Sequence, residues 1–260
     1  MAGKTDTKIT HPGVSPLAKI GANVKIGFNV FIADGAEIKD NCTIETGAII
    51  YENALIGANT YIGAQCIIGE RLHGHLSDPN YVNPTTTIGE NSLIRSGTII
   101  YASSRFGRGF QTGHRAVIRE GSVFGENCSF GTMSQSDGHI SVGNNCRVHN
   151  NVFIATYTTI EDNVHFYPMS LTVDSLHPPC QKGREGPHLE KGVIVGARVL
   201  ILPRVRVGAG AVIAGGSVVT HDVEREAVMA GAPARQIKKR TEVRCHLEDR
   251  PAYDVAIENS

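Results

Sequence analysis

Isoleucine recurs at an interval of six residues near the start of the chain, and no other feature restricts the fold as strongly. A helix of 3.6 residues per turn would scatter these side chains around its circumference, whereas a short strand, a bend and another short strand would point all of them inward. The period therefore predicts a solenoid of six-residue repeats. The recurring residues are Ile20, Ile26, Ile32, Ile38, Ile44, Ile50, Ile56, Ile62 and Ile68.

The same period returns in two later blocks, over residues 88–166 and 195–219, with Val, Phe or Ile at most of the inward positions. The chain is thus one solenoid with two interruptions. We expect these, at residues 70–87 and 173–194, to be loop excursions, and loops of that length are often functional.

Three hexads would complete one triangular coil, so that residues eighteen apart lie on the same face of neighbouring coils, about 4.8 Å apart. Each buried Ile would contribute roughly 1.5 to 3 kcal/mol of transfer free energy. A coil buries its surface only against its neighbours, so both ends need caps. We therefore expect an all-β unit over residues 1–222, followed by a short C-terminal helical segment and tail over residues 223–260.

Composition and charge exclude several classes of protein. The 25 basic and 25 acidic residues balance, so the broad basic surface of a nucleic-acid-binding protein is not expected. No apolar run approaches the ~20 residues that span a bilayer, and residues 1–10 lack the apolar stretch of a secretory signal. The six cysteines form no CxxC pair, which favours reduced thiols in a cytoplasmic protein without a metal. Four of them fall on a small core position of the repeat, namely Cys42, Cys66, Cys128 and Cys146.

Two stretches late in the chain carry a family resemblance. Residues 213–223 read Ile-Ala-Gly-Gly-Ser-Val-Val-Thr-His-Asp-Val, and residues 229–235 read Met-Ala-Gly-Ala-Pro-Ala-Arg. They resemble the closing signature of the hexapeptide-repeat acyltransferases, and the resemblance covers residues 14–240. It implies a left-handed parallel β-helix, a hand that the period cannot supply because parallel crossovers are otherwise right-handed. It also implies acetyl-CoA as co-substrate and a homotrimer with active sites between subunits.

A second stretch narrows the expected reaction. Residues 110–115 read Phe-Gln-Thr-Gly-His-Arg and residues 118–120 read Ile-Arg-Glu, which is similar to N-acetyltransferases acting on nucleotide-linked 3-amino-3,6-dideoxyhexoses of the dTDP type. We therefore expect the amino group of a nucleotide-linked amino sugar to attack the acetyl thioester directly. A sugar amine with a pKa of about 8 is partly neutral at physiological pH, so only the ammonium formed after attack needs help in losing a proton.

His114 is the candidate catalytic base for that proton. Imidazole titrates in the right range, and the resemblance places this histidine beside the sugar. It falls at a corner of its coil, where side chains project outward. Thr132 and Asn150 fall on the same corner in the next two coils, roughly 5 and 10 Å away.

Other polar residues at the corners of these coils are candidates for binding the acceptor, although corners are polar in any solenoid. Asp137 or Glu120 would hold a sugar hydroxyl or orient an imidazole, and the sequence leaves that choice open. Ser136 stands where an aliphatic residue is expected, and such a lapse is typical of functional sites. The candidates are Gln111, Arg115, Arg119, Glu120, Asp137, His139, Asn150 and Asn151.

The resemblance assigns coenzyme A to the later coils. It places the pantetheine arm on backbone groups beside Ala197 and Gly215. It also implies that Asp174 and His177 of the second loop lie close to this arm and that Thr220 lies near the adenine end. Where the family frequently has lysine this chain has His221, so three cations after the last coil are expected to meet a CoA phosphate. The cofactor candidates are Asp174, His177, Ala197, Gly215, Thr220, Arg235, Lys238 and Lys239.

Three other functions remain as alternatives. A sugar or antibiotic O-acetyltransferase would use the same fold, with heavier dependence on the histidine base. A γ-class carbonic anhydrase would need three imidazoles around one zinc ion, but the chain's histidines lack the pair five residues apart that this class shows late in its coils. A non-catalytic scaffold would not bind acetyl-CoA at all.

Overall fold

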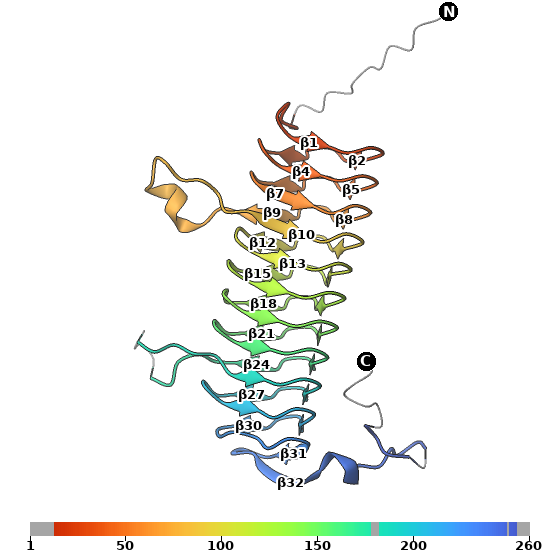
Figure 1. Cartoon of the computed structure of the whole chain (residues 1–260), viewed down its shortest axis with the longest axis vertical. Coiled ribbons are helices and arrows are strands. Elements are labelled where there is room, and N and C mark those ends of the chain that lie inside the picture. Colours follow the sequence, from red (N-terminus) through yellow and green to blue (C-terminus); the bar gives the residue numbers. More distant parts are fainter. Residues whose placement is uncertain (1–12, 178–181, 249, 254–260) are drawn as a thin grey trace, which may run out of the picture.

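The computed structural model describes residues 13–177, 182–248 and 250–253. They wind into a triangular prism of about 12 turns whose three faces are parallel β-sheets (Figure 1). The coils form a left-handed β-helix, as the resemblance implies. No helix among the described residues is long and apolar enough to cross a membrane.

Each coil contributes one short strand to each sheet, and neighbouring strands in a sheet come from successive coils. Sheet 1 contains β1 (Lys19–Ile20), β4 (Glu37–Ile38), β7 (Ala54–Ile56), β10 (Thr86–Ile88), β13 (Arg105–Phe106), β16 (Val123–Phe124), β19 (Ser141–Val142), β22 (Thr159–Ile160), β25 (His188–Leu189) and β28 (Arg206–Val207).

Sheet 2 contains β2 (Lys25–Ile26), β5 (Thr43–Ile44), β8 (Tyr61–Ile62), β11 (Leu93–Ile94), β14 (Gln111–Thr112), β17 (Ser129–Phe130), β20 (Arg147–Val148), β23 (His165–Phe166), β26 (Ile194–Val195), β29 (Val212–Ile213), β31 (Ala227–Ala230) and β32 (Arg235–Lys239). Sheet 3 contains β3 (Phe31–Ile32), β6 (Ile49–Ile50), β9 (Ile67–Glu70), β12 (Ile99–Tyr101), β15 (Val117–Ile118), β18 (Gln135–Ser136), β21 (Phe153–Ile154), β24 (Leu171–Thr172), β27 (Leu200–Ile201) and β30 (Val218–Val219).

The repeated isoleucines form the core, as the period predicts. In sheet 1, Ile20 pairs with Ile38 and Ile38 pairs with Ile56, which places residues eighteen apart in register. From Ile32 onward these side chains are almost completely buried. The four cysteines at the small core position are buried too. Burial raises the pKa of the Cys66 thiol to about 11, so this group is a core donor and not a nucleophile.

The middle of the core contains more aromatic rings than the small aliphatic pattern predicts. The ring of Phe106 lies 4.4 Å from that of Phe110 and 5.3 Å from that of Phe124, measured between centroids. Small inward residues occupy other positions of these coils: Ser136 is buried, with its Oγ 3.3 Å from Ser122 Oγ. The lapse at Ser136 therefore lies inside the prism, where hydrogen bonding satisfies the hydroxyl groups.

Both loops leave the corner between sheet 3 and sheet 1, which we call corner 3–1, and project from the same side of the prism (Figure 1). The first contains the 3-10 turn η1 (His73–Leu76) and ends earlier than expected, at β10. The second runs over residues 173–187, because Leu189 of β25 already pairs with Ile160 and Val207. The expected end at residue 194 is therefore wrong by one strand.

The expected C-terminal helical segment is also wrong. β31 continues sheet 2 by pairing in parallel with β29, and β32 folds back antiparallel on β31. The 3-10 turn η2 (Arg240–Glu242) follows. The apolar residues Ala227 and Val228 bury against the last coil, so this hairpin covers the open end of sheet 2 as a helix would have done.

Candidate functional site

His114 lies at the corner between sheet 2 and sheet 3, which we call corner 2–3. Its backbone amide donates a hydrogen bond to Thr132 Oγ1 at 3.2 Å, and the amide of Thr132 donates to Asn150 Oδ1 at 2.9 Å. These three residues thus stack in consecutive coils, as their spacing predicts. The contacts fix the position of the His114 backbone along the edge of the prism.

The same column of turns continues to the two small cofactor candidates. Arg198 N donates to Pro168 O at 3.0 Å, and Gly216 N donates to Ala197 O at 2.8 Å. Ala197 and Gly215 are both exposed. Ala197 stands four coils from His114, roughly 19 Å by strand spacing. One edge of the prism therefore carries both the candidate base and the residues assigned to the pantetheine arm.

The imidazole of His114 is exposed and, within the described residues, has no hydrogen-bond or ion-pair partner. Arg115 and Asn151, one corner position further, are also exposed and have φ of 54° and 57°, in the left-handed region. Gln111 points outward from β14 in sheet 2. The four candidates His114, Gln111, Arg115 and Asn151 are therefore all exposed at or beside corner 2–3, within two coils of one another.

The remaining acceptor candidates lie on corner 3–1, on the other side of sheet 3. Arg119 Nη2 lies 2.8 Å from Glu120 Oε1, and Arg119 Nη1 lies 3.0 Å from Asp137 Oδ1. The Arg119 guanidinium also lies over the ring of Tyr101, 6.0 Å from its centroid. Both carboxylates whose role the sequence left open are therefore paired with arginine.

Asp137 has a second arginine partner that sequence reasoning missed. Arg184, in the second loop, donates to Asp137 Oδ2 at 3.3 Å, to Thr156 Oγ1 at 3.0 Å and to Asp174 Oδ2 at 2.7 Å. Arg184 thus fastens the second loop, including the cofactor candidate Asp174, to corner 3–1. Nothing in the loop's composition distinguishes this arginine, because the contact is purely tertiary.

His139 lies in the same corner but takes no part in this network. Its ring stacks on that of Tyr157, with centroids 5.8 Å apart and an interplanar angle of 25°. Its backbone amide donates to Glu120 O at 2.7 Å. Neither Asp137 nor Glu120 makes a side-chain hydrogen bond to the His139 imidazole.

Two adjoining hollows bring three cofactor candidates together on corner 3–1. A hollow of about 190 Å³ is lined by Asp174 and His177, together with Lys182. A neighbouring hollow of about 480 Å³ is lined by Thr220, and the two share Arg204. Asp174, His177 and Thr220 are therefore neighbours, but sheet 3 separates them from Ala197 and Gly215 within one chain.

The three cations assigned to a CoA phosphate lie on β32 at the C-terminal end of the prism. Arg235 and Lys239 are exposed and Lys238 is half-buried. Arg235 Nη1 donates to Ala234 O at 2.9 Å. Arg240, just beyond, is occupied differently: its Nη1 donates to the carbonyl groups of two corner glycines, and burial lowers its pKa.

The outer face of sheet 3, between the two corners, is apolar along most of its length. Phe31 and Phe153 are 44% and 38% exposed, although both are large aromatic residues. Sheet 1, by contrast, presents mostly charged and polar side chains outward. Such a contiguous apolar surface usually marks a protein interface. Its outward residues are Phe31, Ile49, Ile67, Ile99, Val117, Gln135, Phe153, Leu171, Leu200 and Val218.

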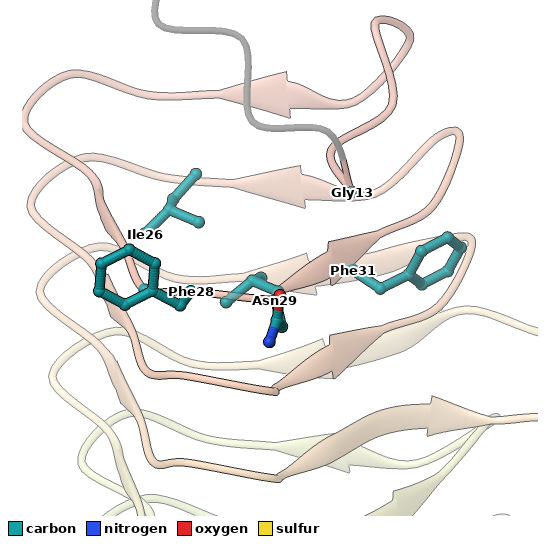
Figure 2. Close-up of a pocket in the computed structure, with 7 residues that line it drawn as sticks. Gly13, Ile26, Phe28, Asn29 and Phe31 are labelled. Carbon is teal, nitrogen blue, oxygen red and sulfur yellow. The ribbon is translucent and has the colours of Figure 1, made fainter.

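A larger hollow, of about 770 Å³, lies at the N-terminal end of the prism. Figure 2 shows Phe28 and Phe31 extending to opposite sides of the coil, with Asn29 between them. Phe28 is 84% exposed. The side chains that line this hollow are apolar or amide groups without a titratable group among the described residues, so it offers no acid–base chemistry.

The described residues contain no group of three or more His, Cys, Asp or Glu side chains that could hold a metal ion. In sequence, residues 17–52 match the model for the bacterial transferase hexapeptide (six repeats). Residues 117–155 and 188–221 match the model for the hexapeptide repeat of succinyl-transferase. All three stretches lie within the coils.

Two known proteins illustrate the likeness. A 2,3,4,5-tetrahydropyridine-2,6-dicarboxylate N-acetyltransferase of Staphylococcus aureus (strain MRSA252) is 40% identical over 85 residues, which are 33% of this chain and 34% of that protein. The match thus spans about a third of the curated relative. The UDP-N-acetylglucosamine O-acyltransferase of Moraxella catarrhalis RH4 superposes with a TM-score of 0.53 at 17% identity, over 88% of this chain and 76% of that one. These matches show hexapeptide repeats of bacterial transferase type in three stretches of the coils, and the solved structure shows the same fold.

Proposed function

We propose that this protein transfers an acetyl group from acetyl-CoA to the amino group of a nucleotide-linked amino sugar, of the dTDP-3-amino-3,6-dideoxyhexose type. The observation that carries the proposal is the single column of corner 2–3. It presents the exposed imidazole of His114 and, four and five coils on, the exposed backbone beside Ala197 and Gly215. The matched relative, named as an N-acetyltransferase, supports an amine as the acceptor.

The chemistry asks little of the protein beyond positioning. The neutral amine attacks the thioester carbonyl, a C–N bond forms, and the C–S bond breaks to release the CoA thiolate. The ammonium proton passes to the His114 imidazole, and from there the thiolate or solvent takes it up. An unpaired, exposed imidazole at a rigid corner suits this role, because it can meet an incoming acceptor without first breaking an internal hydrogen bond.

A homotrimer explains why the candidate residues fall on two corners. If three prisms pack their apolar sheet 3 faces around a common axis, corner 2–3 of each copy meets corner 3–1 of the next. His114 of one subunit would then face Arg119, the second loop and Thr220 of its neighbour. This arrangement supports active sites between subunits, and it withdraws the sheet 3 face from water, at about 25 cal/mol per Å² of apolar area.

An O-acetyltransferase acting on a sugar or an antibiotic is the second candidate. The free imidazole of His114 favours it as much as N-transfer, because a hydroxyl acceptor needs a base from the start. The acceptor therefore decides between the two functions.

Thiol release from acetyl-CoA, measured with a panel of acceptors, tests the proposal. The panel includes nucleotide-linked 3-amino-3,6-dideoxyhexoses and the same sugars with a hydroxyl at C3. We expect turnover with the amines, and mass spectrometry should find one acetyl group in amide linkage. Turnover with hydroxyl acceptors alone would establish the second candidate instead. Absence of thiol release, together with absence of a thermal shift on adding acetyl-CoA, would contradict both.

A further inference from the structure

Four side chains on two neighbouring coils form a cluster beside corner 2–3, in which Arg147 and Tyr167 are exposed and His149 and His165 are half-buried. Arg147 and His165 point outward from β20 and β23 and are direct register partners in sheet 2. His149 and Tyr167, at the first position of the two following turns, stack with ring centroids 4.9 Å apart and an interplanar angle of 13°. Tyr167 is 43% exposed. We call the His149–Tyr167 pair the ring platform.

The face of the ring platform that is directed toward His114 is uncovered. In the two preceding coils the same turn position is glycine, at Gly113 and Gly131, so no side chain lies over the His149 ring at these positions. A Cβ at Gly113 would come within 2.1 Å of Thr132 N, and a Cβ at Gly131 within 2.3 Å of His149 C. Close passage of the coils thus keeps both positions glycine, and the result is a shelf two coils long beside His114.

The charge around the platform is positive and lacks a partner. Within the described residues Arg147 forms no ion pair, and the outward residues of the flanking strands β17 and β26 are Ser129 and Ile194. Burial, and then the charge of Arg147, lowers the pKa of His149 and of His165. Both imidazoles are therefore neutral near pH 7, which suits stacking and leaves Arg147 as the fixed charge.

We propose that this cluster binds the nucleotide of the acceptor, with the base stacked on His149 and the diphosphate against Arg147. Aromatic bases stack on planar rings whichever polar groups the base carries. A guanidinium group is the usual partner of phosphate oxygens. His149 lies two coils from His114, roughly 10 Å along the prism. This distance leaves room for a sugar ring between the two residues. The assignment to the acceptor rests on the proposed function, but the nucleotide site itself does not.

Calorimetric titration with dTDP tests the site without any catalysis. We expect wild-type protein to bind dTDP, and His149→Ala and Arg147→Gln each to weaken binding by about tenfold or more. His149→Phe keeps a flat ring and should bind within about threefold of wild type, which separates stacking from a merely structural role. Circular dichroism melting confirms that each variant is folded, and His149→Leu provides a second ring deletion if His149→Ala is not.

Two matched controls come from elsewhere in the chain. Tyr81→Ala removes a ring that packs edge-on against His75 in the first loop, with centroids 6.1 Å apart. Arg105→Gln removes an exposed arginine from the outer face of sheet 1. We expect both to leave dTDP binding within about twofold of wild type. Equal loss in these controls, or absence of dTDP binding to the wild-type protein, would overturn the inference.

CoA also offers a planar base with phosphates, so its binding is measured with the same variants. We expect His149→Ala and Arg147→Gln to retain CoA affinity; loss of CoA with retention of dTDP would mean that the platform takes the adenine, and would overturn the acceptor assignment. Thiol release keeps the two proposals apart. If kcat/KM for a nucleotide-linked amine is unchanged in His149→Ala, the platform does not bind the nucleotide of the acceptor, and the proposed function stands. If the protein binds dTDP but releases no thiol with any acceptor, the proposed function is refuted and the nucleotide site stands.

Discussion

The amide of His114 donates a hydrogen bond to Thr132 Oγ1 at 3.2 Å, so the position of the candidate base is fixed by the coil that follows it. The backbone is held while the imidazole is exposed. The corner therefore holds the His114 backbone in place, and replacing the imidazole should change the chemistry and not the fold.

Replacement of His114 by Asn tests the role of the imidazole. With an amine acceptor we expect kcat to fall by no more than about a hundredfold, because the departing thiolate can also take the proton. With a hydroxyl acceptor the fall should be about 10²- to 10⁴-fold, the usual contribution of a general base. Steady-state thiol release measures both. His188→Asn, on the outer face of sheet 1, is the control, and an unchanged kcat in His114→Asn for both acceptors would remove the base assignment.

Charge on the outer face of sheet 3 tests the trimer. Ile99→Lys places an ammonium group in the apolar face, so we expect the species at about three times the 27.8 kDa chain mass to dissociate. Sedimentation velocity measures this, and thiol release should fall with it. Leu55→Lys makes the same change at a half-buried aliphatic residue on sheet 1. A monomeric wild-type protein, or dissociation by Leu55→Lys alone, would contradict the arrangement.

Removal of Arg184 tests how the second loop is held. Arg184→Ala deletes the contacts to Asp137, Thr156 and Asp174 together. We expect faster amide hydrogen exchange in the loop and a higher KM for acetyl-CoA, with the exchange of the coils unchanged. Arg105→Ala serves as the comparison. Equal exchange of the loop in wild type and Arg184→Ala would show that other contacts hold it.

The pKa values of His149 and His165 should respond to the charge of Arg147. Both pKa values lie below the ordinary 6.5, so below that pH the unfolded chain binds protons that the folded protein does not. Stability from this source is therefore complete above pH 6.5 and decreases as the pH falls toward the folded-state pKa values. In Arg147→Gln we expect NMR titration to show both midpoints raised, but still below 6.5 because burial persists. Midpoints that do not move would exclude Arg147 as a cause.

The sequence alone predicted the prism, because an inward-pointing residue recurs at every sixth position and this pattern does not depend on contacts between distant parts of the chain. Prediction from the sequence failed for elements whose structure depends on pairing with distant strands. The short apolar run at Ala227 and Val228 fits a helix or a strand equally, and only pairing with β29 selects the strand. Leu189 falls six residues before Val195, so the period extends one strand further back than we predicted.

The site was predictable to the same extent. Spacing of eighteen placed His114 over Thr132 and Asn150. It could not place Ala197, because the second loop breaks the count between Pro168 and Ala197. Arg184 gave no sequence signal at all, since its importance comes only from three partners that folding brings to it.

Titration of CoA into an Ala197→Trp variant is the most direct test of the claim that corner 2–3 carries the thioester arm. Ala197 is exposed, so an indole there would cover the edge without disturbing the core. Ala22→Trp is the control, since Ala22 is an exposed alanine at the corresponding turn position between sheets 1 and 2. We predict that Ala197→Trp weakens CoA binding at least tenfold, about 1.4 kcal/mol, with an unchanged melting temperature. CoA affinity equal to that of wild type in Ala197→Trp would contradict the account.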